Sequence, residues 1–293
     1  MKVSIVIRTY NEQQHLGELL RGIQAQQGPH EIETIIVDSG STDHTLEIAA
    51  DFPVRFVHIR KEDFSFGRSL NVGCAEAQGD ALVFVSGHCI PVGPNWIADL
   101  VAPLGTDGIV YTYGGQVGND ASHFSEKQIF QKYFPPKTDK LPQDGFYCNN
   151  ANAALLRTVW AEHRFDEDLT GLEDMHLAKR LVAQGLKLGY VSSAAVYHLH
   201  NESWAQVRRR FEREAIALQY IMPEVHLQRR DVLRYFTSAV MLDMGAAVQQ
   251  KAWRHNVLAI LAYRFHQFTG AYRGNHFHRR LSRSIKEAYF YPR

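Results

Sequence analysis

Polar side chains follow two apolar strands that lie close together in the sequence. Val3–Ile7 runs into Arg-Thr-Tyr-Asn-Glu at residues 8–12, and Ile35–Val37 runs into Asp38 and a Ser-Gly-Ser-Thr turn. In open α/β sheets, ligands collect beyond the carboxyl ends of the strands, where such loops lie. A nucleotide base needs an acceptor for its imide N–H, and a carboxylate at a strand end supplies one. We therefore predict a nucleotide site with Asp38 at the base; the alternative is that Asp38 only caps its turn.

Two further groups of side chains have the chemistry to meet a phosphate or a metal ion. Arg68 and Asn71 stand three residues apart in an expected helix, so they project to one face, where a guanidinium can bind a phosphate through two hydrogen bonds. Tyr197-His-Leu-His places His198 and His200 on the same face of a strand, and imidazole nitrogen is a good ligand for transition ions. A solvated arginine and two surface histidines among fifteen remain the alternatives.

Alternating strands and helices must position these residues. Strands are predicted at residues 3–7, 35–37, 54–59, 81–85, 151–156, 186–191 and 195–197. Helices are predicted at about 12–27, from Thr42 or Asp43 through Ala49, around 72–77, at 96–104 and at 172–184. This order indicates an α/β fold, a mostly parallel sheet with helices on its faces. Residues 105–145 have the composition of long loops, with one helical patch near 125–134.

Past residue 202 the pattern becomes purely helical and basic. One apolar stripe runs from Trp204 to Met222, and two more helices are expected at about 228–250 and 252–268. We interpret the stripe as core, with a membrane-surface helix as the alternative, because arginines flank it. The expected domains are residues 1–202 and a helical extension over residues 203–293.

Charge is unevenly distributed along the chain of 293 residues. The net charge is +1, but residues 201–293 hold 16 Lys and Arg against 7 Asp and Glu, about +9, and residues 1–200 hold 16 against 24, about −8. The overall balance gives no indication of nucleic-acid binding, whereas the basic third leaves contact with anionic lipid or an anionic ligand open. Cys74, Cys89 and Cys148 lack zinc spacing and are interpreted as reduced thiols.

The N-terminal residues and the distribution of apolar residues bear on where the protein is located. The first residues form an expected strand rather than a signal peptide, and no apolar run approaches the roughly 20 residues of a membrane span. We expect a cytoplasmic protein, soluble or peripherally attached to the inner face of the cell membrane.

Taken together, the motifs resemble a known family. IVIRTYNE (5–12), IVDSGSTD (36–43), RSLNVG (68–73), LVFVSGHCIP (82–91) and GLEDMHLAKR (171–180) are similar, in order and approximate spacing, to the signatures of family 2 glycosyltransferases of the GT-A fold. The resemblance covers roughly residues 1–200 and is specific because the five motifs agree in order. FSFGRSLN with FYCNNANAALLR (146–157) is most similar to a bacterial subgroup of rhamnosyltransferase-like enzymes of surface-polysaccharide assembly.

The resemblance implies a set of residues that bind the nucleotide sugar. These are Thr9, Asn11, Glu12, Asp38, Ser39, Arg68, Asn71, Ser86, Gly87 and His88. The family places an Asp-x-Asp motif after the fourth strand to hold a divalent cation, and this chain has Ser86-Gly87-His88 instead. A neutral imidazole at His88 can still bind a metal and suits Mn²⁺ or a later transition ion better than Mg²⁺. The expected cofactor is therefore a divalent cation, Mn²⁺ or Mg²⁺, held by His88 with His198 or His200.

The resemblance also implies the catalytic residues. The acidic pair Glu173-Asp174 matches the family's acids over the acceptor site, with Asp174 as the base that takes the proton of an acceptor hydroxyl and Glu173 in support. Acids at a helix N-terminus also interact favourably with the helix dipole, and this structural role does not exclude the catalytic role. Asn150 and Asn152 are candidates for a wall that faces the sugar or the acceptor, and turn formation is the alternative.

The implied function is an inverting glycosyltransferase that moves a sugar from a nucleotide-diphosphate sugar to a hydroxyl of a glycan or lipid-linked acceptor. A non-catalytic sugar-nucleotide-binding module stays an alternative, because the Asp-x-Asp acids are missing. A nucleotidyltransferase is the other alternative, although residues 8–11 lack the glycines of its phosphate loop. The basic C-terminal region leaves peripheral membrane contact open, and a homodimer is also left open.

Overall fold

The structure is a computed structural model that describes residues 1–277 of the chain. It divides into two compact units, each described here by itself. Unit 1 comprises residues 1–122, 129–169 and 173–200, and unit 2 comprises residues 123–128, 170–172 and those from 201 onward. The domain bounds expected at residues 202 and 203 stay a prediction.

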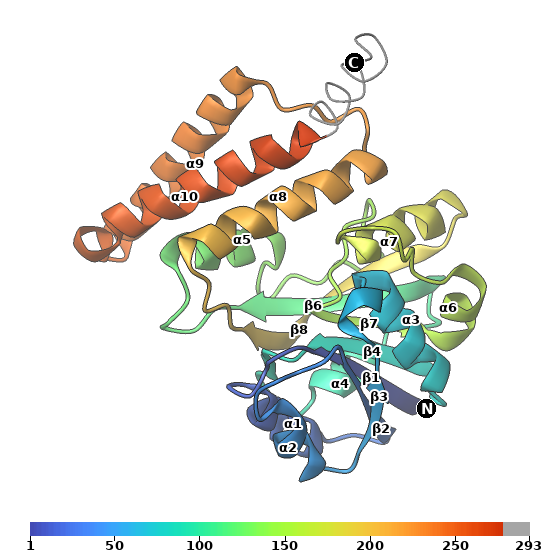
Figure 1. Ribbon diagram of the computed structural model, residues 1–293. Helices are drawn as coiled ribbons and strands as arrows, with labels where there is room; N and C mark the ends of the chain where they lie inside the picture. Colours follow the sequence, from blue (N-terminus) through green and yellow to red (C-terminus); the bar gives the residue numbers. More distant parts are fainter. Residues whose placement is uncertain (278–293) are drawn as a thin grey trace, which may run out of the picture. The chain divides into compact units, whose positions relative to one another are not determined.

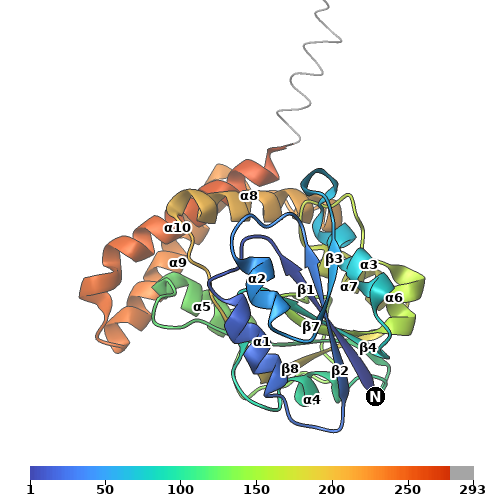
Figure 2. The same ribbon diagram turned by 60° about the horizontal axis from the view of Figure 1, so that its bottom comes forward.

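Unit 1 is built on one mixed β-sheet (Figures 1 and 2). Its strands are β1 (Lys2–Thr9), β2 (Glu31–Asp38), β3 (Val54–His58), β4 (Ala81–Ser86), β5 (Cys89–Pro91), β6 (Ile109–Val117), β7 (Asn152–Leu156) and β8 (Lys187–His198). Their spatial order is β3-β2-β1-β4-β7-β6-β8-β5. The first four are parallel neighbours, β7 is antiparallel to both β4 and β6, β8 is parallel to β6, and β5 is antiparallel to β8. The predicted α/β class is confirmed.

Helices cover both faces of this sheet (Figure 2). One face carries α1 (Leu16–Gln24), α2 (Thr45–Ala50) and α4 (Trp96–Val101), and the other carries α3 (Phe66–Glu76), α6 (Arg157–His163) and α7 (Glu173–Ala183). Successive side chains of a strand point to opposite faces, so Ile5 packs in the first core and Val6 in the second. Burial on both faces explains why these strands are nearly continuous apolar runs.

The structure corrects the expectation of long loops over residues 105–145. This segment contains β6, a buried inner strand, and α5 (Phe124–Tyr133), which agrees with the helical patch. A Cβ on Gly114 would lie 2.0 Å from the carbonyl oxygen of Ala194, so glycine lets β8 approach β6 closely at this point. The two strands expected over residues 186–197 are one strand, β8, and α6 forms where no helix was predicted.

Unit 2 consists mainly of α8 (Trp204–Ile221), α9 (Arg229–Gln249) and α10 (Trp253–Asn275). α10 approaches α8 closely through two glycines one turn apart. A Cβ on Gly270 would lie 2.3 Å from the carbonyl oxygen of Arg208, and one on Gly274 would lie 2.1 Å from that of Glu212. α10 continues past its expected end at residue 268. The far part of the basic tail, residues 278–293, lies outside the described residues.

Several of the charged residues of unit 2 are internal. Arg264 donates from Nε and Nη2 to the two carboxylate oxygens of Asp243, at 2.7 Å each, and both side chains are buried. Such a two-point ion pair is stronger than a single hydrogen bond between neutral groups. Within residues 1–277, no helix is long and apolar enough to cross a membrane.

Candidate active site

The loops after β1 and β2 are held together by Asp38. The parallel register places Thr9 opposite Asp38, and the Thr9 hydroxyl donates to Asp38 Oδ1 at 3.1 Å. The backbone N–H groups of Gly40 and Ser41 donate to Oδ2 at 2.9 Å each, and the residue is only 1% exposed. The buried carboxylate therefore stabilises the loop after β2 through these hydrogen bonds. These contacts agree with the alternative of a turn-forming acid, and the role of Asp38 at the base stays a prediction.

Asn11 joins the same two loops. Its Oδ1 accepts a hydrogen bond from Thr42 N at 2.8 Å, and its N–H donates to the Ser41 hydroxyl at 2.9 Å. Its φ of 58° lies in the left-handed region, which asparagine tolerates better than most residues. Asn11 thus fixes the loops against each other, and its predicted contact with the nucleotide stays a prediction.

A cavity of about 440 Å³ opens beside these loops in unit 1. Its lining residues in the described chain are Arg8, Thr9, Tyr10, Glu12, Ser39, Lys61, Phe64, Phe66, Ser86, Gly87 and His88. Six predicted residues are thus brought together: Thr9, Glu12, Ser39, Ser86, Gly87 and His88. The size and the mixture of aromatic and polar walls suit a nucleotide-sized ligand.

Sequence reasoning missed five lining residues of this cavity, namely Arg8, Tyr10, Lys61, Phe64 and Phe66. Lys61 Nζ donates to the Tyr10 hydroxyl at 2.7 Å, and the Arg8 guanidinium lies 5.1 Å from the centre of the Phe66 ring. Flat rings can stack on a base, and the two cations can face phosphates. The available signal was the aromatic residues inside IVIRTYNE and FSFGRSLN, next to the polar positions that were chosen.

Arg68 and Asn71 do not line this cavity as the structure describes it. Asn71 is buried; its Oδ1 accepts from the Trp160 indole N–H at 3.0 Å and from Phe165 N at 3.1 Å, and its Nδ2 donates to the Phe165 carbonyl at 2.9 Å. Arg68 is half exposed, 3.8 Å from a carboxylate oxygen of Glu167. Asn71 thus connects α3 to the segment around α6, and Arg68 forms a surface ion pair; contact of either residue with the nucleotide stays a prediction.

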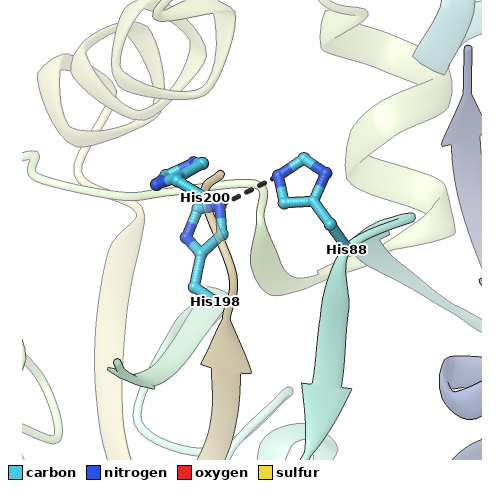
Figure 3. A group of neighbouring side chains, drawn as sticks. All are labelled: His88, His198 and His200. Atoms are coloured by element: carbon cyan, nitrogen blue, oxygen red, sulfur yellow. Dashed lines mark hydrogen bonds between the residues drawn. The ribbon is translucent and has the colours of Figure 1, made fainter. Parts of the chain in front are cut away.

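Three histidines meet at the edge of the cavity (Figure 3). Antiparallel pairing of β5 with β8 places Cys89 opposite His198, so His88 comes to lie beside residues 198–200. The Nε2 atoms of His88 and His198 are 3.2 Å apart, and one nitrogen from each of the three rings lies within 4.8 Å of the others. The structure thus brings His88, His198 and His200 together, as the sequence predicted.

The outer nitrogens of two of these rings face oxygen atoms. His88 Nδ1 lies 2.9 Å from Glu12 Oε1, and His198 Nδ1 lies 2.7 Å from Gln116 Oε1, whose amide orientation is set by donation from its Nε2 to Asn149. A carboxylate or amide oxygen only accepts, so each Nδ1 is the donor in its contact and the two Nε2 atoms face each other. Metal-bound histidines are commonly oriented by such oxygen partners, so this donor set fits a divalent cation.

The absence of a side chain at Gly87 leaves room for the contact between Glu12 and His88. A Cβ there would lie 2.8 Å from Glu12 Cγ. Gly87, expected as part of the nucleotide site, therefore has a packing reason: it leaves room for Glu12 to reach His88.

The acidic pair lies at the start of α7, and both side chains are buried. Glu173 Oε1 forms an ion pair with Arg8 Nη1 at 3.0 Å. Asp174 accepts hydrogen bonds from Asn150 N at 2.8 Å and from Met175 N at 2.7 Å. Burial raises the pKa of Asp174 to about 7 and the Glu173 carboxylate acts in the same direction, while the two N–H donors and Arg8 oppose them. Such a carboxyl can exchange a proton near neutral pH.

The two asparagines before β7 have different surroundings. Asn152 Oδ1 accepts from the Trp96 indole N–H at 2.8 Å, and its Nδ2 donates to the carbonyls of Gly115 and Ala194 at 2.9 and 2.7 Å. Asn152 is fully buried and its side chain is engaged in the core; its place in a sugar or acceptor wall stays a prediction. Asn150 Oδ1 accepts from the Tyr111 hydroxyl, whereas its buried Nδ2 has no partner in the described chain, which leaves a donor near Asp174.

The fold is similar to that of solved glycosyltransferases. Mannosyltransferase PcManGT from Pyrobaculum calidifontis, solved with GDP-Man and Mn²⁺, matches 99% of this chain and 87% of its own with a TM-score of 0.63 and 17% identity. This likeness shows the fold, a mixed sheet of the GT-A type. The chain therefore has the GT-A fold.

Sequence comparison gives the family. Residues 4–164 match the family described as Glycosyl transferase family 2, and the chain belongs to this family. O-antigen chain rhamnosyltransferase RfbN of Salmonella typhimurium is 28% identical over 214 residues, 69% of this chain and 67% of RfbN. O-antigen chain rhamnosyltransferase WbaN of Salmonella anatum is 27% identical over 192 residues, 61% of this chain and 60% of WbaN.

Proposed function

We propose that this family 2 glycosyltransferase transfers a sugar from a nucleotide-diphosphate sugar to a hydroxyl of a glycan or lipid-linked acceptor in surface-polysaccharide synthesis. The transfer inverts the configuration at the anomeric carbon of the sugar. Similarity to two O-antigen chain rhamnosyltransferases supports the acceptor class and favours a deoxy-sugar donor. The observation that carries the proposal is the buried Asp174 carboxyl, whose pKa is raised to about 7 and whose oxygens are fixed by two backbone N–H groups.

The 440 Å³ cavity is the proposed donor site. Tyr10, Phe64 and Phe66 supply flat walls for the base or the sugar, and Ser39 provides a hydroxyl whose Oγ lies 3.1 Å from the Thr9 carbonyl. Arg8 and Lys61 place positive charge where a diphosphate would lie, and such charge stabilises a departing anion. This site uses Thr9, Glu12 and His88 as the sequence proposed, and it replaces Arg68 with Arg8.

Asp174 is the proposed general base. An ionised carboxylate takes the proton of the acceptor hydroxyl as that oxygen attacks the anomeric carbon, and the bond to the diphosphate breaks on the opposite side, which inverts the configuration. Proton transfer by a positioned group contributes roughly 10²–10⁴-fold to a rate. Glu173 positions Arg8 through their ion pair, and the unpaired Nδ2 of Asn150 is the proposed donor to the sugar or the acceptor.

The histidines at residues 88, 198 and 200 are the proposed holders of a divalent cation, Mn²⁺ or Mg²⁺. When bound, such an ion neutralises the diphosphate and stabilises the leaving group. Glu12 and Gln116 orient the two rings so that their Nε2 lone pairs point inward. PcManGT, which shares the fold, was solved with Mn²⁺, and this supports the proposal.

We further propose that residues 1–202 form the catalytic domain and that the basic helical extension, residues 203–293, brings the enzyme to the inner face of the cell membrane. The excess of Lys and Arg in this extension supports the location.

The test is a screen of nucleotide sugars for donor hydrolysis and transfer, each with Mn²⁺, with Mg²⁺ and with EDTA. We expect one class of nucleotide sugar to be hydrolysed slowly without acceptor and to bind with a thermal shift. Binding without any hydrolysis or transfer in wild-type protein would instead favour a non-catalytic module. Release of diphosphate from a sugar phosphate and a nucleoside triphosphate would favour a nucleotidyltransferase.

A further inference from the structure

Unit 2 contains a separate basic cavity of about 380 Å³. Residues from α8, α9 and α10 line it: Arg208, Arg229, Val232, Phe265, Thr269, Tyr272 and Arg273. Three guanidiniums therefore converge on one hollow, and none of its described lining residues is acidic. The close packing of α10 on α8 at Gly270 fixes two of the three helices, because the Arg208 backbone lies directly against that glycine.

The positive charge of this cavity is only partly compensated. Arg273 Nε lies 3.2 Å from a carboxylate oxygen of Glu212. Within residues 1–277, no carboxylate forms an ion pair with Arg208 or Arg229. Arg229 is also the first residue of the 21-residue helix α9, whose N-terminal end carries partial positive charge and is capped by Gln228 and Asp231. Two uncompensated guanidiniums beside a helix N-terminus favour an anion with more than one charge, such as a phosphate or a diphosphate.

One wall of the cavity is apolar and continues along an exposed helix face. Phe265 is 55% exposed, and on α10 it is preceded at helical spacing by Leu261 and Leu258, which are 39% and 77% exposed. Residues three and four apart share a helix face, so these three side chains form one stripe that leads away from the arginines. Leu233 on α9 is also 65% exposed. A free phosphate would not contact this apolar stripe, whereas a hydrocarbon chain could bury apolar surface against it.

We propose that this cavity binds the phosphate or diphosphate group of a lipid, with the hydrocarbon along the stripe Leu258–Leu261–Phe265. Arg208, Arg229 and Arg273 recognise the phosphoryl oxygens, and the aromatic ring of Phe265 lies where head group and chain join. A second copy of this chain is a poorer occupant, because two such basic surfaces repel each other. The inference rests on the proposed membrane location for its choice of lipid and involves no step of sugar transfer.

The test measures binding of the full chain to vesicles without any sugar nucleotide. Three compositions are compared: phosphatidylcholine alone, phosphatidylcholine with polyprenyl phosphate, and phosphatidylcholine with phosphatidylserine at equal surface charge. We expect the strongest binding to the polyprenyl phosphate vesicles. Arg208→Gln with Arg229→Gln should weaken it by about 30-fold, since each arginine lost removes a hydrogen bond to a charged phosphoryl oxygen with a net contribution on the order of 1 kcal/mol.

The matched control is Arg230→Gln with Arg234→Gln, two arginines of α9 outside the cavity, which change the net charge equally. We expect this control to keep most of the binding. Equal loss in both double variants would show diffuse electrostatic attraction and overturn the site, as would full binding by the Arg208/Arg229 variant. Thermal unfolding checks that both variants fold.

A further pair of substitutions separates a lipid from a soluble anion. Leu258→Gln with Leu261→Gln should weaken vesicle binding and leave calorimetric binding of inorganic pyrophosphate unchanged. Two results together would assign the cavity to a soluble diphosphate and overturn the proposal of a lipid ligand. Vesicle binding would be lost only in the arginine variants, and pyrophosphate would bind tightly and displace the vesicles. Because none of these assays uses a donor, failure of the lipid site and failure of the transferase proposal give different results.

Discussion

His88 and His198, which are 110 residues apart in sequence, direct their Nε2 atoms at each other across 3.2 Å. Each ring donates from its other nitrogen to an oxygen, of Glu12 or of Gln116. A cation bound between them would accept both nitrogens. The proposed metal site uses this pair, and His200 supplies a third nitrogen within reach.

We predict that His88→Ala weakens binding of Mn²⁺ and Zn²⁺ at least tenfold, because it removes one of three nitrogen ligands. Titration calorimetry with the metal chloride alone measures this without substrate. His44→Ala is the matched control, since His44 is exposed on another loop with Glu47 as its partner. Unchanged metal affinity in His88→Ala would remove this residue from the site.

A milder change should also affect the metal. Glu12→Gln keeps the shape of the side chain but lets its amide face His88 Nδ1, so the ring is no longer held in one tautomer. We expect metal affinity to fall less than in His88→Ala and turnover with Mn²⁺ to fall with it. Equal metal affinity in Glu12→Gln and wild type would show that the contact at 2.9 Å does not orient the ring.

We predict that Asp174→Asn lowers the rate of sugar transfer by about 10²–10⁴-fold, because the amide cannot accept the proton. Donor affinity, measured by calorimetry, should stay close to that of wild type, since Asp174 is not a lining residue of the donor cavity in the described chain. Asp168→Asn, in the loop before α7, is the control. Near-wild-type transfer by Asp174→Asn would show that another group is the base.

The raised pKa of Asp174 sets an expected pH dependence. The base must be ionised, so kcat/KM should rise as pH increases and level off above about 7. Arg8 opposes the rise in this pKa, so Arg8→Gln should move the acidic limb to higher pH. A pH–rate profile of both proteins measures the shift. An acidic limb at pH 4 to 5 in wild type would mean that Asp174 does not govern the rate.

The same group should make the folded state less stable at high pH. Because the folded pKa lies above the unfolded value of 3.8, ionised Asp174 opposes folding; the effect is absent below about pH 4 and complete above about pH 7. Asp174→Asn should therefore gain stability relative to wild type as pH rises, by an amount on the order of 1–4 kcal/mol. Urea unfolding at pH 5 and pH 8 measures it, and a constant difference would contradict the shift.

We predict that Asn152→Ala destabilises unit 1 by about 3 kcal/mol, because it leaves the Trp96 indole N–H and two buried carbonyls without their partner. Asn95→Ala is the control: Asn95 is exposed and its side chain caps no helix N–H. Chemical unfolding compares the two. A similar small effect for both would mean that water replaces the lost contacts.

Strong local patterns made much of the fold predictable. The strands after Val3 and Ile35 are apolar on both faces, and the loops that follow them were correctly placed at one edge of the sheet. β6 was missed because Gly114 and Gly115 resemble a loop in sequence. They occur in a strand here because residues of β8, some eighty positions later, come too close for a side chain at that point.

The site was predictable only where its chemistry is local. His88, His198 and His200 could be found from residue type and strand periodicity. By contrast, the roles of Asp38, Asn71 and Asn152 depend on hydrogen-bond partners that the sequence does not bring near them. A polar residue at a strand end suits a ligand and suits a structural network equally well, and only the distances to its partners decide between the two.

The position of β8 has a consequence for the order in which the proposed metal site is assembled. β8 is the last strand of the sheet in the described chain, it pairs with both β6 and β5, and it ends at His198. During synthesis on the ribosome, His88 emerges long before the two histidines that complete its cluster. A nascent chain that has not yet added β8 therefore holds a single imidazole and gains no more than weak metal affinity. At the proposed site, tight metal binding therefore follows the addition of β8 to the sheet.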